Sequence, residues 1–329
     1  MITETKVPLR RLGESDLEIS ALGLGTWQFS KGNNMVGRYW SDVNETDIEK
    51  IVEVSYSGGI NWFDTAEVYG KGKSEEALAL ALNKLKDGGE KAFIATKWWP
   101  LFRKADSIIK TIDERIVTLK DKKIDLYQIH QPYSFSSVKA EMDALAELLK
   151  QGKIRYAGVS NFNEAKMREA HAVLKEHGFP LVSNQMKYSL LDRRIEKNGV
   201  LQAAKELGMT IIAYSPLEQG LLSGKFHKNP ELLQNIKGMR KHFSAIKPQN
   251  LERTRPLIDL LDKLAIDYGV STTQIALNWL IHFHGDTIVA IPGASKIHHA
   301  EQNIGTLSFK LSQKHLQEID RVSNKVALK

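Results

Sequence analysis

Residues 60–70 read Ile60-Asn61-Trp62-Phe63-Asp64-Thr65-Ala66-Glu67-Val68-Tyr69-Gly70, an apolar run that ends abruptly at a carboxylate. The run predicts a short buried strand, because it is apolar and aromatic and follows two glycines. A carboxylate at the end of such a strand costs free energy to bury unless it has a partner. Asp64 taken alone is most simply interpreted as a capping or structural residue. The other elements of the chain are needed to interpret it further.

Short apolar runs alternate with helical segments along most of the chain. We expect strands at residues 21–24, 60–63, 92–96, 125–129, 154–159, 181–184, 210–213 and 287–291. We expect helices at about 74–85, 106–119, 138–150, 164–176, 196–207, 252–267 and 272–283, after a first helix that Ser41 or Asn44 caps and that ends near residue 57. Eight short apolar strands alternating with helices predict an α/β fold, a (β/α)8 TIM barrel formed by residues 1–329 as a single domain. An open doubly wound sheet is the alternative, but no G-x-G-x-x-G follows an early strand.

Three further features are expected outside the barrel repeat. A β-hairpin at residues 9–20 precedes the barrel, and a long loop at 214–250 follows the seventh strand. A short helix after Ser295 leads to an extra C-terminal helix at about 312–323. Residues 226–250 are candidates for a segment that closes over a ligand, with Gly238 and Pro248 as its bounds.

The composition is that of a globular protein, with 42% hydrophobic and 26% charged residues. The net charge is +7, but the basic residues are scattered and no nucleic-acid motif is present, so we expect no nucleic-acid binding. The chain has no cysteine, which excludes disulfides and thiolate chemistry. No apolar run approaches about 18 residues, so we expect no membrane span. Because the N-terminus also has no apolar leader, we expect a cytoplasmic protein.

Polar side chains gather where the expected strands end. Asp64 ends the second strand, Lys97 follows the third and His130 ends the fourth, while Tyr69 lies on the loop beyond Asp64. The later strands end in Ser160-Asn161, Asn184-Gln185 and Tyr214-Ser215. Each residue alone has a structural explanation, such as a snorkelling lysine or a satisfied core histidine. In a barrel, however, the carboxyl ends of the strands share one mouth, so their convergence predicts a site.

The first four of these groups have the chemistry needed to reduce a carbonyl. Asp64 can pair with Lys97, and a cation beside a phenol lowers the pKa of Tyr69 from its usual value of about 10. A phenol with a pKa closer to neutral gives its proton more readily to a developing alkoxide. His130 can orient the carbonyl oxygen. None of these groups supplies a hydride, so a reduced cofactor is needed.

Six motifs stand in one order along the chain and resemble those of the aldo-keto reductase superfamily. They are Gly23-Leu24-Gly25-Thr26-Trp27, Asp64-Thr65-Ala66-Glu67-Val68-Tyr69-Gly70, Ala95-Thr96-Lys97, Gly152-Lys153-Ile154-Arg155, Gly158-Val159-Ser160-Asn161-Phe162 and Ile291-Pro292-Gly293. The likeness spans about residues 8–320. It implies a (β/α)8 barrel whose catalytic residues are Asp64, Tyr69, Lys97 and His130, with Tyr69 as the general acid. It also implies that NADP(H) lies extended across the mouth of the barrel.

The resemblance further implies where this cofactor is held. Ser160, Asn161 and Gln185 would hold the carboxamide, and Tyr214 would stack on the nicotinamide. The other cofactor contacts that it implies are Thr26, Trp27, Asp64, Ser215, Pro216, Leu217, Gln219, Gly220, Lys225, Gly293, Ser295, Lys296, His299, Gln302 and Asn303. Lys296 would contact a 2′-phosphate and so favour NADP over NAD. The chain departs from the pattern at His299, where many members carry an Arg, and at Gly293, where some carry a Lys.

Other ligands are less well supported by the sequence. His298 and His299, with His282 and His284, are metal-ligand residue types, but no carboxylate or cysteine spacing accompanies them and we expect no metal. An apolar pocket for an aldehyde or ketone is expected from Trp27, Trp98, Trp99 and Tyr133. Trp98 and Trp99 have the alternative of packing the barrel rim. The sequence leaves open whether the protein is a monomer or a homo-oligomer.

A second class of function also stays open. Potassium-channel β-subunits share the barrel and have a motif that Asp64-Thr65-Ala66-Glu67-Val68-Tyr69 resembles, so an NADP(H)-binding regulatory or redox-sensing subunit is the alternative to a carbonyl reductase. Those subunits typically have Asn where this chain has His130, which favours an enzyme.

Overall fold

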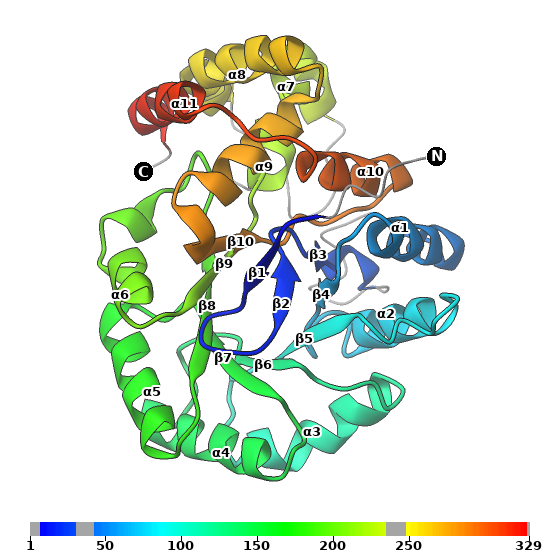
Figure 1. The fold of residues 1–329 in the computed structure, drawn as a ribbon, viewed down its shortest axis with the longest axis vertical. Coiled ribbons are helices and arrows are strands. Elements are labelled where there is room, and N and C mark those ends of the chain that lie inside the picture. The colour runs from blue at the N-terminus through cyan, green and yellow to red at the C-terminus, as the bar shows by residue number, and fades with distance from the viewer. Residues whose placement is uncertain (1–6, 31–42, 235–247, 328–329) are drawn as a thin grey trace.

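Eight parallel strands form a closed ring at the centre of the protein, in a computed structural model that describes residues 7–30, 43–234 and 248–327 (Figure 1). The strands are β3 (Leu24–Gly25), β4 (Trp62–Asp64), β5 (Phe93–Trp98), β6 (Leu126–Ile129), β7 (Tyr156–Ser160), β8 (Leu181–Lys187), β9 (Thr210–Tyr214) and β10 (Ile288–Ala290). Neighbours in the sheet are neighbours in the chain. Parallel bridges from Leu22 to Ala290 and from Gly25 to Gly293 join the first strand to the last. The predicted (β/α)8 barrel is therefore confirmed.

Helices surround the ring and cover the outer face of the sheet (Figure 1). They are α1 (Glu45–Ser57), α2 (Lys73–Asn83), α3 (Asp106–Thr118), α4 (Val138–Lys150), α5 (Glu164–Glu176), α6 (Val200–Glu206), α9 (Thr272–His282) and α10 (Ile297–Thr306). Several begin at a polar side chain that accepts a hydrogen bond from the backbone N–H three residues on, which satisfies a donor at the helix start. These caps are Asn44, Ser137, Asn163 and Ser271. Of the two caps expected for α1, Asn44 is the one used, and Ser41 lies outside the described residues.

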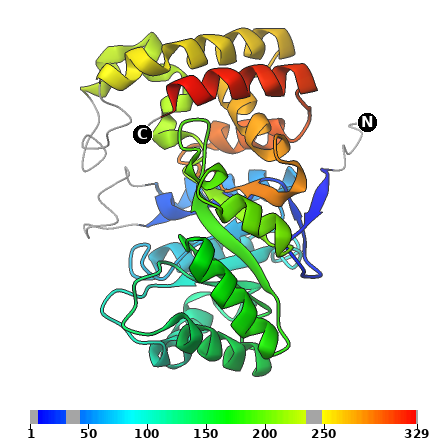
Figure 2. The same cartoon turned by 90° about the vertical axis from the view of Figure 1, so that its left-hand side faces the viewer.

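Helices α8 (Pro248–Tyr268) and α11 (Gln313–Val326) lie side by side beyond α9 and α10, outside the ring (Figure 2). The expected extra C-terminal helix is α11, which Ser312 caps. It buries Leu316 and Ile319 against the protein and exposes its polar face. None of the helices in the described ranges is long and apolar enough to span a membrane.

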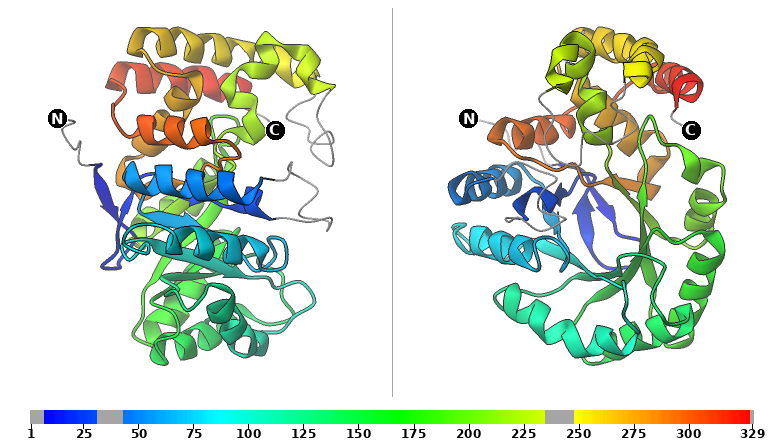
Figure 3. Two further views of the ribbon diagram at one scale, coloured as in Figure 1. Left: turned by 90° about the vertical axis from the view of Figure 1, so that its right-hand side faces the viewer. Right: turned by 180° about the vertical axis from the view of Figure 1, so that it is seen from behind.

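The expected hairpin consists of β1 (Leu9–Arg11) and β2 (Glu18–Ser20) and lies across one end of the barrel (Figures 1 and 3). Leu12, Leu17 and Ile19 are buried there against side chains that fill the barrel interior, such as Trp62. The Gly13 N–H donates to the hydroxyl of Thr210, the first residue of β9. The hairpin therefore closes the end at which the strands begin, and the other end is the one open to ligands.

Two expected segments differ from the structure. The helix expected at 196–207 is divided into η3 (Arg194–Glu196) and α6, because Gly199 between them takes a left-handed conformation with φ of 84°. The expected loop at 214–250 contains η4 (Glu218–Ser223), α7 (Lys225–Lys228) and η5 (Pro230–Leu233), and α8 already begins at Pro248. Gly238 and most of the segment expected to close over a ligand lie outside the described residues.

Candidate active site

The carboxyl ends of the strands open into a cavity of about 1470 Å³. Most residues expected at the site line it: Thr26, Trp27, Asp64, Tyr69, Trp99, His130, Ser160, Asn161, Gln185, Tyr214, Ser215, Pro216, Leu217, Gln219, Gly220, Lys225, Gly293, Ser295, His299, Gln302 and Asn303. Four expected residues do not line it, namely Lys97, Trp98, Tyr133 and Lys296. The structure thus brings together residues that lie more than 270 positions apart in the chain, from Thr26 to Asn303.

An ion pair between Asp64 and Lys97 lies at the base of this cavity. The Lys97 ammonium donates to Asp64 Oδ1 at 2.5 Å and to the carbonyl oxygen of Thr65 at 2.7 Å. Gln185 Nε2 and Gln128 Nε2 donate to the other carboxylate oxygen at 2.9 and 3.3 Å. Both charged side chains are almost entirely buried, and these extra hydrogen bonds satisfy them in place of water. Burial lowers the pKa of Lys97, and the charge of Asp64 opposes that shift.

Tyr69 lies directly above this pair. The Lys97 ammonium is 5.2 Å from the centre of the Tyr69 ring, which stacks on Trp27 at 6.1 Å between centroids. The ring of His130 meets the Tyr69 ring edge-on at 5.7 Å. The segment from Thr65 to Val68 therefore carries the chain across the mouth, so that Tyr69 faces His130 at the end of β6.

The expected lowering of the Tyr69 pKa is wrong. Removal of the phenol from water raises the pKa of Tyr69 well above 10, and the negative charge of Asp64 raises it further. Lys97 does not reverse this shift, because Asp64 and the Thr65 carbonyl already bind its ammonium group. Tyr69 is consequently a neutral phenol at neutral pH and carries a proton that it can donate.

His130 is a neutral imidazole at the same mouth. Burial and the nearby charge of Lys97 lower the pKa of His130 well below 6.5. The Nδ1 atom of His130 is buried and has no hydrogen-bond partner in the described part of the chain. Its ring is flanked by Trp99, which meets it edge-on at 5.1 Å. A neutral imidazole offers one donor and one acceptor, which suits it to orient a polar group.

A line of hydrogen bonds runs along the neighbouring strand ends. Tyr214 donates its hydroxyl to Asn161 Oδ1 at 2.9 Å, and Asn161 Nδ2 donates to Ser160 Oγ at 3.1 Å. Ser160 in turn donates to the backbone carbonyl of Gln185 at 3.0 Å. Asn161 takes a positive φ of 60°, which turns its side chain along this line. These contacts fix four of the expected cofactor residues relative to one another.

The loop after β9 folds back over the cavity with an unusual backbone. Ser215, Glu218 and Gln219 all have positive φ, and Gly220 has φ of 90°. A Cβ on Gly220 would lie 3.5 Å from the Lys225 ammonium, so the lysine lies against this turn. Buried Glu218 holds the turn to the barrel, because its Oε2 accepts a hydrogen bond from the Lys187 ammonium at 3.1 Å. The result is exposed backbone beside a cation, an arrangement that suits an anion.

The start of α10 forms the far wall of the cavity. Ser295, His299, Gln302 and Asn303 line it, and Asn303 Nδ2 is buried without a hydrogen-bond partner among the described residues. Burial lowers the pKa of His299 to about 4, and the positive charges of His298, Lys225 and Lys296 contribute. Lys296 itself is exposed and lies outside the cavity lining.

Two of the expected substrate-pocket residues are placed elsewhere. Trp98 does not line the pocket: it is fully buried on the outer face of β5, where its Nε1 donates to Ser107 Oγ of α3. Successive residues of a strand point to opposite faces, so Lys97 inside the barrel requires Trp98 outside. Tyr133 is also outside the cavity lining, 45% exposed, with its ring edge-on to Trp99. Trp27 and Trp99 do line the cavity, as expected.

Sequence reasoning missed several residues of the site. The buried Gln128 binds Asp64, and its position on β6, two residues before His130, was the signal that both face the barrel interior. A second group comes from α8 and the turn into α9 and includes Asp262, Ile266 and residues 269–273. No sequence signal marks that group, because it reaches the cavity only through packing. Within the described ranges, no group of three His, Asp or Glu side chains is arranged to hold a metal ion.

Comparison with known proteins identifies the family of this chain. The sequence profile of the aldo/keto reductase family matches residues 21–324. The chain belongs to the aldo-keto reductase family. It is 37% identical over 296 residues to an uncharacterized oxidoreductase of Mycobacterium tuberculosis, covering 90% of this chain and 86% of the relative. Aldo-keto reductases use NADP(H).

Solved structures of the family have the same fold. The glycerol dehydrogenase of Gluconobacter oxydans superposes with a TM-score of 0.83 at 27% identity, over 98% of this chain and 97% of that one. An aldo/keto reductase of Klebsiella pneumoniae, crystallised with NADP and acetate, superposes with a TM-score of 0.72 at 24% identity, over 98% and 96% of the two chains. At that identity, the second likeness concerns the fold alone.

Proposed function

We propose that this protein is an NADP-dependent oxidoreductase acting on CH–OH groups, which reversibly reduces aldehydes and ketones to alcohols. One observation carries the proposal: the protonated phenol of Tyr69 and the neutral imidazole of His130 face each other at 5.7 Å above the buried Asp64–Lys97 pair. A carbonyl oxygen within reach of both the Tyr69 hydroxyl and a His130 ring nitrogen meets a proton donor and an orienting group at once. Membership of the aldo-keto reductase family supports the same reaction class.

The residues around the cavity fit an extended dinucleotide. The Gly220 turn and the Lys225 ammonium offer exposed backbone and positive charge to a pyrophosphate. The unpartnered amide of Asn303 and the cationic surroundings of His299 suit an adenosine phosphate at the far wall. At the near end, Asn161 and Tyr214 offer polar and aromatic contacts to a nicotinamide. When bound there, NADPH supplies the hydride.

The chain's own residues provide the remaining steps. Tyr69 donates its hydroxyl proton to the carbonyl oxygen as negative charge develops there. His130 holds the same oxygen by a hydrogen bond and so sets which face of the carbonyl is presented. Lys97 places a positive charge beneath the phenol that stabilises the phenolate left after proton transfer. Asp64 keeps Lys97 in place, and Gln128 and Gln185 hold Asp64.

Aromatic walls on both sides of this site favour an apolar carbonyl substrate. Trp27 stacks on Tyr69, and Trp99 meets His130 edge-on, so the two tryptophans flank the acid and the orienting residue. We infer that aromatic and aliphatic aldehydes or ketones bind between them, with their apolar portion against the rings.

Replacement of the proposed acid tests this function. Purified protein is expected to oxidise NADPH with para-nitrobenzaldehyde, and Tyr69→Phe is expected to lower kcat by about 10²- to 10⁴-fold. The dissociation constant for NADPH, measured by fluorescence, is expected to stay unchanged. Tyr133→Phe is the matched control, because it removes a tyrosine hydroxyl outside the cavity. Wild-type kcat in Tyr69→Phe would exclude the acid role, whereas NADPH binding without turnover of any aldehyde would favour a regulatory subunit.

A further inference from the structure

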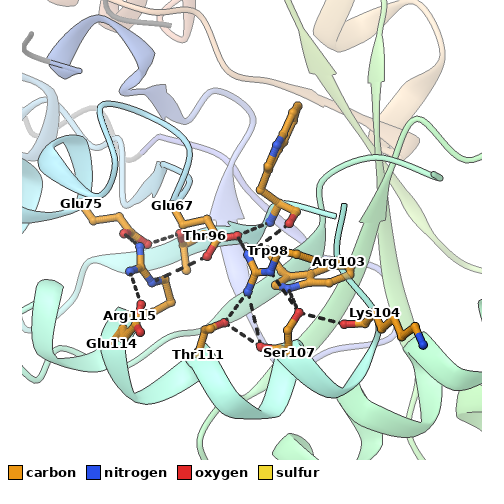
Figure 4. Close-up of polar contacts among 11 residues, drawn as sticks. Glu67, Glu75, Thr96, Trp98, Arg103, Lys104, Ser107, Thr111, Glu114 and Arg115 are labelled. Atoms are coloured by element: carbon orange, nitrogen blue, oxygen red, sulfur yellow. Dashed lines mark hydrogen bonds and ion pairs between the residues drawn. The ribbon is translucent and has the colours of Figure 1, made fainter. Parts of the chain in front are cut away.

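A largely but not fully buried carboxylate next to the site, Glu67, takes no part in the chemistry proposed above. It lies two residues before Tyr69, and its side chain is only 11% exposed. Glu67 Oε1 accepts two hydrogen bonds, one from the backbone N–H of Trp99 and one from Arg103 at 2.5 Å. Its Oε2 lies 4.0 Å from the guanidinium of Arg115 (Figure 4). The loop that carries Tyr69 is thus tied to the loop that carries Trp99.

Arg103 extends this tie to a third loop. Its guanidinium is anchored on α3 by Ser107 Oγ at 3.0 Å and Thr111 Oγ1 at 2.8 Å (Figure 4). The same group donates to the backbone carbonyl of Trp99 at 3.1 Å. The Arg103 carbonyl accepts from the backbone N–H of Phe135, on the segment between His130 and α4, at 2.9 Å. Glu67 and Arg103 together therefore hold the loops that follow β4, β5 and β6.

Glu67 and Arg103 bind the two backbone polar groups of Trp99. Glu67 binds its N–H and Arg103 binds its carbonyl oxygen. The Trp99 ring lies between His130 at 5.1 Å and Tyr133 at 6.1 Å, edge-on to both. A shift of the Trp99 backbone therefore changes the wall against which a substrate rests and the packing of His130.

We propose that Glu67, held by Arg103, is a positioning residue that sets substrate selectivity by fixing the Trp99 wall of the pocket. The inference rests on the proposed carbonyl reduction. Aromatic substrates depend on that wall more than small aliphatic ones, because only a ring fills the space along Trp99. Loss of Glu67 therefore weakens the binding of aromatic aldehydes selectively and leaves the cofactor residues in place.

Asp125 provides a matched control that tests whether the effect of Glu67 is only structural. Asp125, immediately before β6, is a buried carboxylate that accepts from the backbone N–H of Ile94 at 2.9 Å and from Arg155 at 2.8 Å. It lies at the opposite end of the barrel from the cavity, since β6 runs from Leu126 towards His130. Asp125→Ala thus removes the same kinds of contacts as Glu67→Ala without touching Trp99.

The experiment compares the ratio of kcat/KM for para-nitrobenzaldehyde to that for propanal in wild type, Glu67→Ala and Asp125→Ala. We expect Glu67→Ala to lower this ratio by roughly tenfold, mainly through the KM of the aromatic aldehyde, since hydrogen bonds to a charged group are lost. Asp125→Ala is expected to keep the wild-type ratio, even though it lowers the melting temperature. The dissociation constant for NADPH is expected to be the same in all three proteins.

Two further variants keep the inference testable if Glu67→Ala does not fold. Glu67→Gln keeps an oxygen for the Trp99 N–H and is expected to retain most of the selectivity. Arg103→Lys keeps the charge but cannot bridge Ser107, Thr111 and Trp99 at once, and is expected to lower the ratio. An unchanged ratio in both Glu67→Ala and Arg103→Lys, or an equal loss in Asp125→Ala, overturns the inference. Failure of the wild type to oxidise NADPH with either aldehyde instead overturns the proposed function.

Discussion

At the scale of single residues, the Asp64–Lys97 pair is a costly polar feature of the barrel interior. Both charges are taken out of water, and removal of one partner from such a pair generally costs about 3–5 kcal/mol. Gln128, Gln185 and the Thr65 carbonyl offset that cost by satisfying the remaining donors and acceptors. A charge pair held this rigidly needs no reorganisation when charge develops above it, which is what a catalytic site requires.

The raised pKa of Tyr69 leads to a prediction for the pH dependence of turnover. The acid form of Tyr69 is the reactive one, and its pKa lies well above 10, so the active fraction falls only as the pH rises through that value. His130 has a pKa well below 6.5 and is neutral throughout this range. We expect kcat/KM for reduction of para-nitrobenzaldehyde to be level between about pH 6.5 and pH 10 and to fall above it. A descending limb centred near neutral pH would mean that the charge of Lys97 prevails over burial.

At the scale of elements, one end of the cavity is formed by segments that lie beyond the strand ends. The turn in η4 supplies Gly220, α7 begins at Lys225, and α10 supplies the wall that contains His299 and Asn303. These segments lie about 70 residues apart, yet Lys225 is close enough to His299 to contribute to the lowering of its pKa. Positive charge from two elements thus converges at one end of the cavity, where a phosphate can be held.

The two lysines of these elements are expected to contribute differently to cofactor binding. Lys225 lies against the turn proposed for the pyrophosphate, a group that NADPH and NADH share, so Lys225→Ala is expected to raise both dissociation constants alike. Lys296 stands at the N-cap of α10, where we propose a contact with the 2′-phosphate that only NADPH carries. Lys296→Ala is therefore expected to raise the dissociation constant for NADPH more than that for NADH, as measured by fluorescence titration. If Lys296→Ala raised the dissociation constants for NADPH and NADH by the same factor, Lys296 would not be the residue that binds the 2′-phosphate.

For the whole molecule, the two ends of the barrel have separate tasks. The hairpin β1–β2 closes the end at which the strands begin (Figure 3). It buries Leu12, Leu17 and Ile19 against the interior. The cavity occupies the other end. Because the two ends are separated by the packed interior, stability and chemistry can be changed independently.

A core substitution under the hairpin tests this separation. Leu17 is 1% exposed, and Leu17→Ala is expected to lower the free energy of unfolding by about 2–5 kcal/mol, measured by chemical denaturation. The KM for para-nitrobenzaldehyde is expected to stay at the wild-type value. Leu80→Ala serves as the control, since Leu80 is 48% exposed on α2 and its loss is expected to change stability little. A large rise in KM for Leu17→Ala would show that the two ends are coupled.

Much of the fold was predictable because its signals are local. The apolar runs and helix caps are patterns of a few residues, and they placed α4 and α5 at the observed bounds of 138–150 and 164–176. Helix α6 was predicted too long, because the effect of Gly199 depends on the backbone angle it takes next to Glu164. Trp98 was assigned to the pocket wrongly, although the alternation of side chains along a strand places it outside once Lys97 is inside.

The sequence by itself determined that a barrel forms and that Asp64, Tyr69, Lys97 and His130 meet at one mouth, because strand order and strand ends follow from short-range patterning. Only the tertiary structure decided the direction of the Tyr69 pKa shift and the tie from Glu67 through Arg103 to Trp99. Burial and electrostatic interaction depend on distances between segments far apart in the chain. Those distances exist only once the barrel has closed.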